Sequence, residues 1–110
     1  MKNVSVYDGE KDKLKHVIVN VTARDIVKGI RGECIKCPVA LAVNRLLKKP
    51  YQATVGFITI YYKTTTNFEG VHGPLMPENV GAFIRTFDNR SPPAPFKFKM
   101  YIPKIVLRHP

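Results

Sequence analysis

The residues with the clearest potential for chemistry are two cysteines that lie three positions apart. Cys34 and Cys37 form a C-x-x-C pair in the segment "GECIKCPVALAVNRLLKK", directly before an apolar pattern with helical spacing. Thioredoxin-like enzymes place such a pair at the start of a helix, where the helix dipole and nearby cations stabilise a thiolate. Arg31 and Lys36 would supply positive charge here. The two cysteines are therefore thiol candidates, and a thiol oxidoreductase is one function to weigh.

The proline that follows the pair argues against redox chemistry. Pro38 fits the first turn of a helix, where its missing N–H costs nothing, so Cys37 becomes the helix N-cap and Cys34 stays in the loop. In the redox motif, by contrast, the first cysteine opens the helix and the second lies one turn inside it. We therefore expect Cys37 to cap the helix or to pack as a small apolar residue, and Cys34 to be dispensable.

Other catalytic arrangements are missing from the sequence. A zinc site would need two ligands beyond the cysteines, and no second C-x-x-C or H-x-x-H is present. Three histidines, His16, His72 and His109, occur singly. The chain also lacks a glycine-rich phosphate loop and a recognisable pair of acids. We expect no metal, no cofactor and no catalytic residue, and hence a protein that is not an enzyme.

Positive charge is the main functional signal that remains. The chain has 110 residues, and its 18 Lys and Arg against 8 Asp and Glu give a net charge of +10. Such an excess attracts nucleic acid, acidic protein surfaces or acidic membranes. The densest cluster falls in the region of two predicted helices and consists of Arg24, Lys28, Arg31, Lys36, Arg45, Lys48 and Lys49. Lys97 and Lys99 form a secondary basic stripe on the last predicted strand, where we favour protection of a sheet edge against aggregation.

Length and composition indicate one globular domain over residues 1–110. The N-terminus lacks the apolar stretch of a signal peptide, and no run approaches the roughly 18 apolar residues of a membrane helix. Two cysteines suit a reducing compartment, so we expect free thiols. The expected location is the cytoplasm, without a membrane partner.

The N-terminal half is expected to form a hairpin and two helices. "NVSVY" and "LKHVIVNV" flank a polar turn and predict a hairpin over about residues 3–21. A short helix follows, with Thr22 as N-cap, Asp25 as capping-box partner and Gly29 as stop. "PVALAVNRLLKK" predicts the second helix, whose last turn would hold its two lysines. Its apolar stripe is Val39, Ala42, Val43, Leu46 and Leu47.

The C-terminal half is expected to form strands around one helix. "ATVGFITIYYKTTT" predicts one central strand, and "NFEGVHGPL" pairs with it or loops out. "MPENVGAFIRTFDNR" predicts a helix, "FKFKMYI" an alternating strand, and residues 104–110 an edge segment or a loose tail. The predicted shared core is Val39, Val43, Leu46, Ile58, Phe83, Ile84, Phe87 and Phe98. The fold class is α+β, a single two-layer domain with an antiparallel or mixed sheet and helices on one face.

Three segments, "DIVKG", "CPVALA" and "FIRTFDNR", stand in an order that resembles a family of small uncharacterised proteins from bacteriophages and some bacteria. That family shares the pattern T-x-x-D-I-x-x-G…C-P-V-A-L-A…F-I-x-x-F-D, in which the cysteine at the position of Cys37 is the recurrent one. The resemblance covers residues 16–103. The chain departs from the family pattern in its N-terminal hairpin and in "YKTTTNFEGVHGPL". It implies a fold and a phage setting, but no activity.

The sequence favours two functions over a third. The first is a small basic binding protein, phage-encoded, that engages the acidic surface of a host protein or complex in the host cytoplasm, in one version as an inhibitor. The alternative is a nucleic-acid or nucleotide binding protein that uses the same basic surface. A thiol oxidoreductase based on Cys34 and Cys37 comes third.

Overall fold

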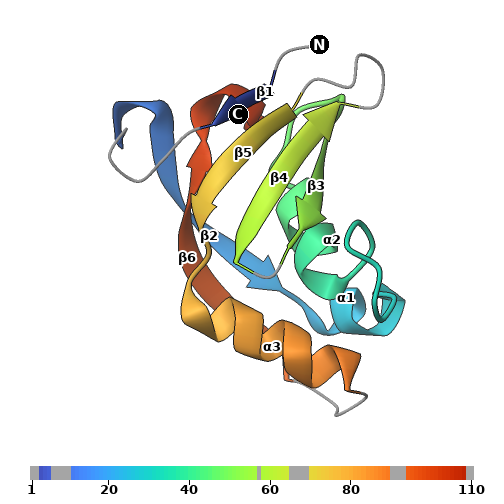
Figure 1. The fold of residues 1–110 in the computed structure, drawn as a ribbon. Coiled ribbons are helices and arrows are strands. Elements are labelled where there is room, and N and C mark those ends of the chain that lie inside the picture. The colour runs from blue at the N-terminus through green and yellow to red at the C-terminus, as the bar shows by residue number, and fades with distance from the viewer. Residues whose placement is uncertain (1–2, 6–10, 57, 65–69, 90–93, 109–110) are drawn as a thin grey trace.

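The residues that the computed structural model describes, 3–5, 11–56, 58–64, 70–89 and 94–108, form two β-sheets and three α-helices (Figure 1). The strands are β1 (Asn3–Ser5), β2 (Leu14–Val21), β3 (Tyr51–Val55), β4 (Thr59–Thr64), β5 (Gly70–Leu75) and β6 (Phe96–Pro103). The helices are α1 (Ala23–Lys28), α2 (Pro38–Asn44) and α3 (Glu78–Asp88), with short 3-10 turns at Lys11–Lys13 and Lys104–Val106. Together they make a single α+β domain, which confirms the predicted fold class.

The described strands are divided between two sheets, where the sequence predicted one. Four strands form a mixed sheet in the order β1-β5-β4-β3, with β1 parallel to β5 and the other neighbours antiparallel. β2 and β6 form a separate antiparallel pair. Figure 1 shows α2 lying between β2 and β3, and it contacts both strands. The core therefore sits around α2, between the two sheets.

The predicted N-terminal hairpin over residues 3–21 is wrong. β1 pairs with β5, and β2 pairs with β6 along its full length of 8 residues. The reason is the match between the apolar faces of β2 and β6: Val19 lies opposite Phe98, for example, and both are buried. Such a pairing buries more apolar surface than β1, with 3 residues, offers in a hairpin.

The segment predicted as one central strand is a hairpin of two strands. β3 ends at Val55, β4 begins at Thr59, and the N–H of Gly56 donates to the carbonyl of Thr59 over 2.9 Å. A Cβ at position 56 would lie 3.1 Å from that carbonyl oxygen, so glycine suits the tight turn. The turn leaves Ile58 64% exposed, so its predicted place in the core is wrong. β4 is an inner strand, between β3 and β5.

α1 ends at the predicted glycine, but for a different reason. Gly29 has a φ of −66°, which any residue adopts, so no left-handed conformation requires it. A Cβ there would lie 2.6 Å from the ring carbons of Pro38. The glycine therefore allows the end of α1 to pack against the start of α2, an approach that a larger residue would block.

α2 is shorter and more deeply buried than the sequence predicted. It ends at Asn44 with Arg45 as C-cap, so Lys48 and Lys49 lie beyond the helix and do not complement its dipole. The buried residues are Pro38, Val39, Ala40, Ala42 and Val43. Because β2, β3 and α1 all pack against this helix, it has apolar neighbours on several sides instead of one stripe.

Of the two alternatives predicted for residues 104–110, the structure favours the edge segment over the loose tail for residues 104–108, the part that it describes. Val106 is fully buried, and its carbonyl accepts the backbone N–H of Lys48 over 2.9 Å. Leu107 forms an antiparallel bridge with Leu47. This long-range pairing engages the backbones of Leu47 and Lys48 outside the helix, so α2 does not continue through these residues.

The apolar faces of α3 and β6 are as predicted. Val80, Phe83 and Phe87 of α3 are buried, and Ile84 is partly buried. On β6, Phe98, Met100 and Ile102 are buried, whereas Lys97 and Lys99 are exposed.

A buried carboxylate joins α1, α2 and β2. Thr22 and Asp25 form the predicted capping box, with hydrogen bonds of 2.9 and 3.1 Å between the backbone of each and the side chain of the other. Arg45 donates from both terminal nitrogens to the same carboxylate, over 2.5 and 2.7 Å, and also to the carbonyl of Asn20 over 2.8 Å. Burial would raise the pKa of Asp25, but the hydrogen bonds from Arg45 and Thr22 hold it below its ordinary value.

Replacing Asp25 with Asn should lower the free energy of unfolding at neutral pH by about 2 kcal/mol, because hydrogen bonds to a charged group are lost. Since folding lowers the pKa of Asp25, its contribution is complete above the value for an unfolded Asp, about 3.9, and disappears as the pH falls through the lower folded value. Urea denaturation at a series of pH values should therefore show a steeper loss of stability below about pH 4 in the wild type than in the variant.

The control is Asp12→Asn, which changes an exposed aspartate and should leave the stability and its pH dependence unchanged. An Asp25→Asn variant as stable as the wild type at neutral pH would show that the carboxylate does not hold the three elements together.

Tyr62 on β4 buries a hydroxyl that has no hydrogen-bond partner among the described residues. The side chain is 0% exposed, and burial raises the pKa of its phenol well above the ordinary value. An unpaired polar atom in such a position costs roughly 1 to 3 kcal/mol.

Tyr62→Phe should therefore leave the free energy of unfolding unchanged or raise it by about 1 kcal/mol, since the ring packing is kept. Tyr62→Ala, which removes the ring, should lose about 3 to 5 kcal/mol in the same denaturation experiment. A loss with Tyr62→Phe above about 1 kcal/mol would mean that the hydroxyl makes a stabilising hydrogen bond.

Candidate functional site

The C-x-x-C pair lies where α2 begins, as the sequence predicted. Sγ of Cys37 accepts the backbone N–H of Ala40 over 3.5 Å and so caps the helix, whose first residue is Pro38. Cys37 is buried, whereas Cys34 is exposed in the preceding loop. Burial raises the pKa of the Cys37 thiol, and the negative charge of Asp88 acts in the same direction. A thiol with a raised pKa is a poor nucleophile at neutral pH.

Two contacts hold the loop before α2 against the C-terminal end of α3. Arg31 donates from Nε to the carbonyl of Phe87 over 2.9 Å, and its guanidinium lies 5.0 Å from the centre of the Phe87 ring. Gly32 donates its N–H to Oδ1 of Asp88 over 3.1 Å. Arg31 thus satisfies one of the carbonyls that a helix leaves free at its C-terminal end, where positive charge is favourable.

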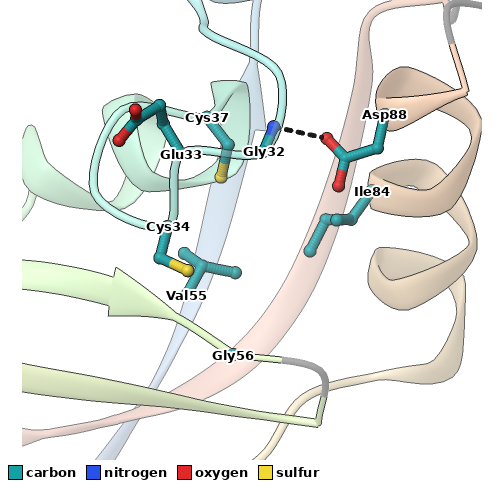
Figure 2. Close-up of a pocket in the computed structure, with 8 residues that line it drawn as sticks. All are labelled: Gly32, Glu33, Cys34, Cys37, Val55, Gly56, Ile84 and Asp88. Carbon is teal, nitrogen blue, oxygen red and sulfur yellow. Dashed lines mark hydrogen bonds between the residues drawn. The ribbon is translucent and has the colours of Figure 1, made fainter.

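A cavity of about 270 Å³ opens between this loop, the end of β3 and α3 (Figure 2). It is lined by Gly32, Glu33, Cys34, Cys37, Val55, Gly56, Ile84 and Asp88. Figure 2 shows the sulfur of Cys34 beside Val55, with Ile84 reaching toward them from α3. The carboxylate of Glu33 points away from that of Asp88, so the two acids do not converge on one point. The cavity is largely apolar and offers no paired acid and base.

The described residues contain no group of three or more His, Cys, Asp or Glu side chains that could hold a metal ion. His16 on β2 stacks on Tyr101, and His72 on β5 tilts against Tyr61. These two histidines therefore belong to separate sheets and lie apart from the cysteines. His109 lies outside the described residues.

The predicted basic cluster is divided between structural and exposed roles. Arg31 is held by α3 and Arg45 by Asp25. Arg24, Lys28, Lys36 and Lys49 are exposed, and Lys48 is half-buried. The cluster is therefore not one uniform basic patch, because two of its arginines have partners within the domain.

Part of that cluster forms a mixed basic and apolar surface, here called the α1 surface, which consists of Arg24, Val27, Lys28, Ile30 and Lys36. Arg24, Val27 and Lys28 share one face of α1 by their spacing. Val27 is 83% exposed and Ile30 is 47% exposed. The N–H of Ile30 donates to the carbonyl of Lys36 over 2.9 Å, which brings the loop residues together.

The secondary basic stripe lies on the outer face of the β2–β6 pair. Three cross-strand pairs define this β2–β6 face: His16 with Tyr101, Ile18 with Lys99, and Asn20 with Lys97. All six side chains are exposed except Tyr101, which is half-buried. The ring centres of His16 and Tyr101 lie 4.6 Å apart at an angle of 22°, so the rings are stacked. The sequence placed Lys97 and Lys99 on one face but paired β2 with β1, so it missed Ile18 and Asn20 opposite the lysines and His16 opposite Tyr101.

The segments that build this face contain no acidic residue. Residues 13–24 and 94–108 have no Asp or Glu, although the chain has 8 in total. They hold Lys13, Lys15, Arg24, Lys97, Lys99, Lys104 and Arg108, which are seven of the 18 Lys and Arg. The positive charge of the protein is therefore uneven along the chain, and two of these seven cations, Lys97 and Lys99, lie on the β2–β6 face itself.

No family model, no curated protein and no solved structure matches the chain. The resemblance to phage proteins therefore stays a prediction. Among the described helices, none is long and apolar enough to cross a membrane.

Only one of the two thiols should react quickly with the thiol reagent DTNB in the folded protein. Cys34 is exposed, whereas Cys37 is buried and has a raised pKa, so Cys34→Ser should abolish fast labelling and Cys37→Ser should preserve it. Cys37→Ala, which removes the cap, should lose about 1 kcal/mol of stability, and Cys34→Ser almost none.

Unfolding in urea is the control, because both thiols should then label at the same rate. Fast labelling of both thiols in the folded wild type would contradict the structural role of Cys37 and return the pair to redox chemistry.

Proposed function

We propose that the protein is a small, basic, non-enzymatic binding protein whose β2–β6 face binds nucleic acid. The observation that carries the proposal is the combination of Lys97, Lys99 and the exposed His16 ring on one sheet face, in segments without any carboxylate. Lysines attract phosphates over long distances, and exposed rings give bases a surface to contact.

Electrostatics favours this face over the cations near the helices. Two arginines of the predicted cluster are held within the domain: Arg45 pairs with the carboxylate of Asp25, and Arg31 donates to the carbonyl of Phe87, the residue before Asp88. The carboxylate of Asp25 beside Arg45 reduces the field that a polyanion would meet there. No described acidic residue lies on β2 or β6.

Protection of a sheet edge against aggregation explains only some of the side chains on the β2–β6 face. It accounts for lysines on a two-stranded sheet, since charged side chains discourage pairing with another chain. It does not require the neighbouring Ile18, which is 59% exposed, or an exposed ring at His16. A binding role accounts for the charged and the uncharged members of the face together.

The α1 surface supports a second candidate, an acidic surface of a partner protein. Val27 is 83% exposed beside Arg24 and Lys28, and a surface that combines apolar and basic side chains suits a protein partner. In the phage setting that the resemblance implies, this partner would be a protein or complex of the host.

Two double reversals with equal change of charge separate the surfaces. Lys97→Glu with Lys99→Glu alters the β2–β6 face, and Lys28→Glu with Lys36→Glu alters the α1 surface. Each lowers the net charge of the protein from +10 by four, so an effect of total charge is matched. Fluorescence anisotropy with labelled oligonucleotides at several salt concentrations measures the affinity.

The β2–β6 reversal should weaken oligonucleotide binding at least about tenfold. It should also reduce the slope of log affinity against log salt concentration by the contribution of two phosphate contacts. The α1 reversal should leave the affinity within about threefold of the wild-type value. Equal losses in both variants would indicate general attraction instead of a defined face. Absence of binding by the wild type at low salt would refute the nucleic-acid proposal and leave the protein partner at the α1 surface.

A further inference from the structure

We infer that the β2–β6 face selects single-stranded over double-stranded nucleic acid, with unpaired bases on the stacked rings of His16 and Tyr101 and phosphates on Lys97 and Lys99. This inference rests on the proposed function and adds the class of nucleic acid. It depends on the exposure and the order of the side chains along the two strands.

The ring pair is fixed on one side and open on the other. Tyr101 is half-buried and packs partly against the hydrophobic core, which anchors it. His16 lies against it with 4.6 Å between ring centres and is exposed to solvent. An anchored ring that carries an exposed ring is preorganised, so a base that stacks there loses little entropy in ordering the protein.

The lysines follow the rings in a regular row. Along β6 the order is Tyr101, Lys99 and Lys97, with side chains on the same face at intervals of about 7 Å. Ile18 lies opposite Lys99 and presents an apolar side chain between the rings and the last lysine. A strand of nucleic acid that lies along this row meets the stacked rings first, then Lys99 with Ile18 beside it, and then Lys97 with Asn20 beside it.

A duplex would use this row less well. A two-stranded antiparallel ribbon fits the major groove, where Asn20 and the lysines would meet base edges and phosphates. The faces of the bases in a duplex are covered by their neighbours, however, so the rings would find only edges. Only unpaired bases offer the faces that the exposed His16 ring can stack on.

The test compares an oligomer of about 12 deoxythymidines, a duplex of equal length and an abasic strand with the same phosphates. His16→Ala removes the exposed ring and leaves Tyr101 in place. The matched control is His72→Ala on β5, because His72 is also exposed and lies against a tyrosine, Tyr61, with 4.4 Å between ring centres. Thermal unfolding of each variant confirms that the fold is kept.

The wild type should bind the single strand at least about fivefold more tightly than the duplex or the abasic strand. His16→Ala should lose at least about fivefold for the single strand and nothing for the duplex, and His72→Ala should change neither. Equal affinity for single strand and duplex, or an unchanged His16→Ala, would overturn the inference while the proposed binding by Lys97 and Lys99 stands. Absence of binding to all three probes would instead refute the proposed function.

Discussion

The burial of α2 between the two sheets is the constraint on which the rest of the structure depends. A helix of 7 residues is unstable alone, so packing and its terminal hydrogen bonds must hold it. Its first turn is capped by Cys37, its last residue Asn44 accepts the N–H of Ala53 over 2.7 Å, and Arg45 reaches Asp25. Each of these bonds also places a neighbour: the C-x-x-C loop, β3 and α1. The thiol of Cys37, a candidate for redox chemistry in the sequence, thus stabilises the start of this helix.

The same packing closes one edge of the larger sheet. β3 is its last strand, and the outward N–H groups of Tyr51, Ala53 and Val55 donate to α2 and to the segments on either side of it. The acceptors are the carbonyl of Lys48, the side chain of Asn44 and the carbonyl of Cys34. With these groups satisfied, β3 offers no open row of donors to another chain. The contacts that stabilise α2 therefore make this edge of the larger sheet unsuitable for strand addition.

Local chemistry was sufficient to predict the features that neighbouring residues determine. The capping box of Thr22 and Asp25, the cap at Cys37 and the alternation of β6 all follow from residues within one or two turns. The errors arose where distant segments compete. β2 prefers β6 to β1, and Val106 and Leu107 draw the chain after α2 out of the helix. For the candidate face, the sequence supplied the two lysines of β6, but only the true register supplies the residues opposite them.

A charged residue that has a partner within the domain serves the fold. An exposed charged residue without such a partner keeps its charge for other molecules. Asp25 and Asp88 accept hydrogen bonds that hold α1 and the C-x-x-C loop, and Arg31 and Arg45 lie in the same contacts. Lys97 and Lys99 form no ion pair with another described residue. An exposed lysine without a partner contributes little to folding, yet its charge acts fully on an approaching polyanion. The net charge of +10 alone therefore does not show where free cations lie, because Lys97 and Lys99 on the β2–β6 face and Lys28 and Lys36 on the α1 surface are exposed, whereas Arg31 and Arg45 are used by the fold.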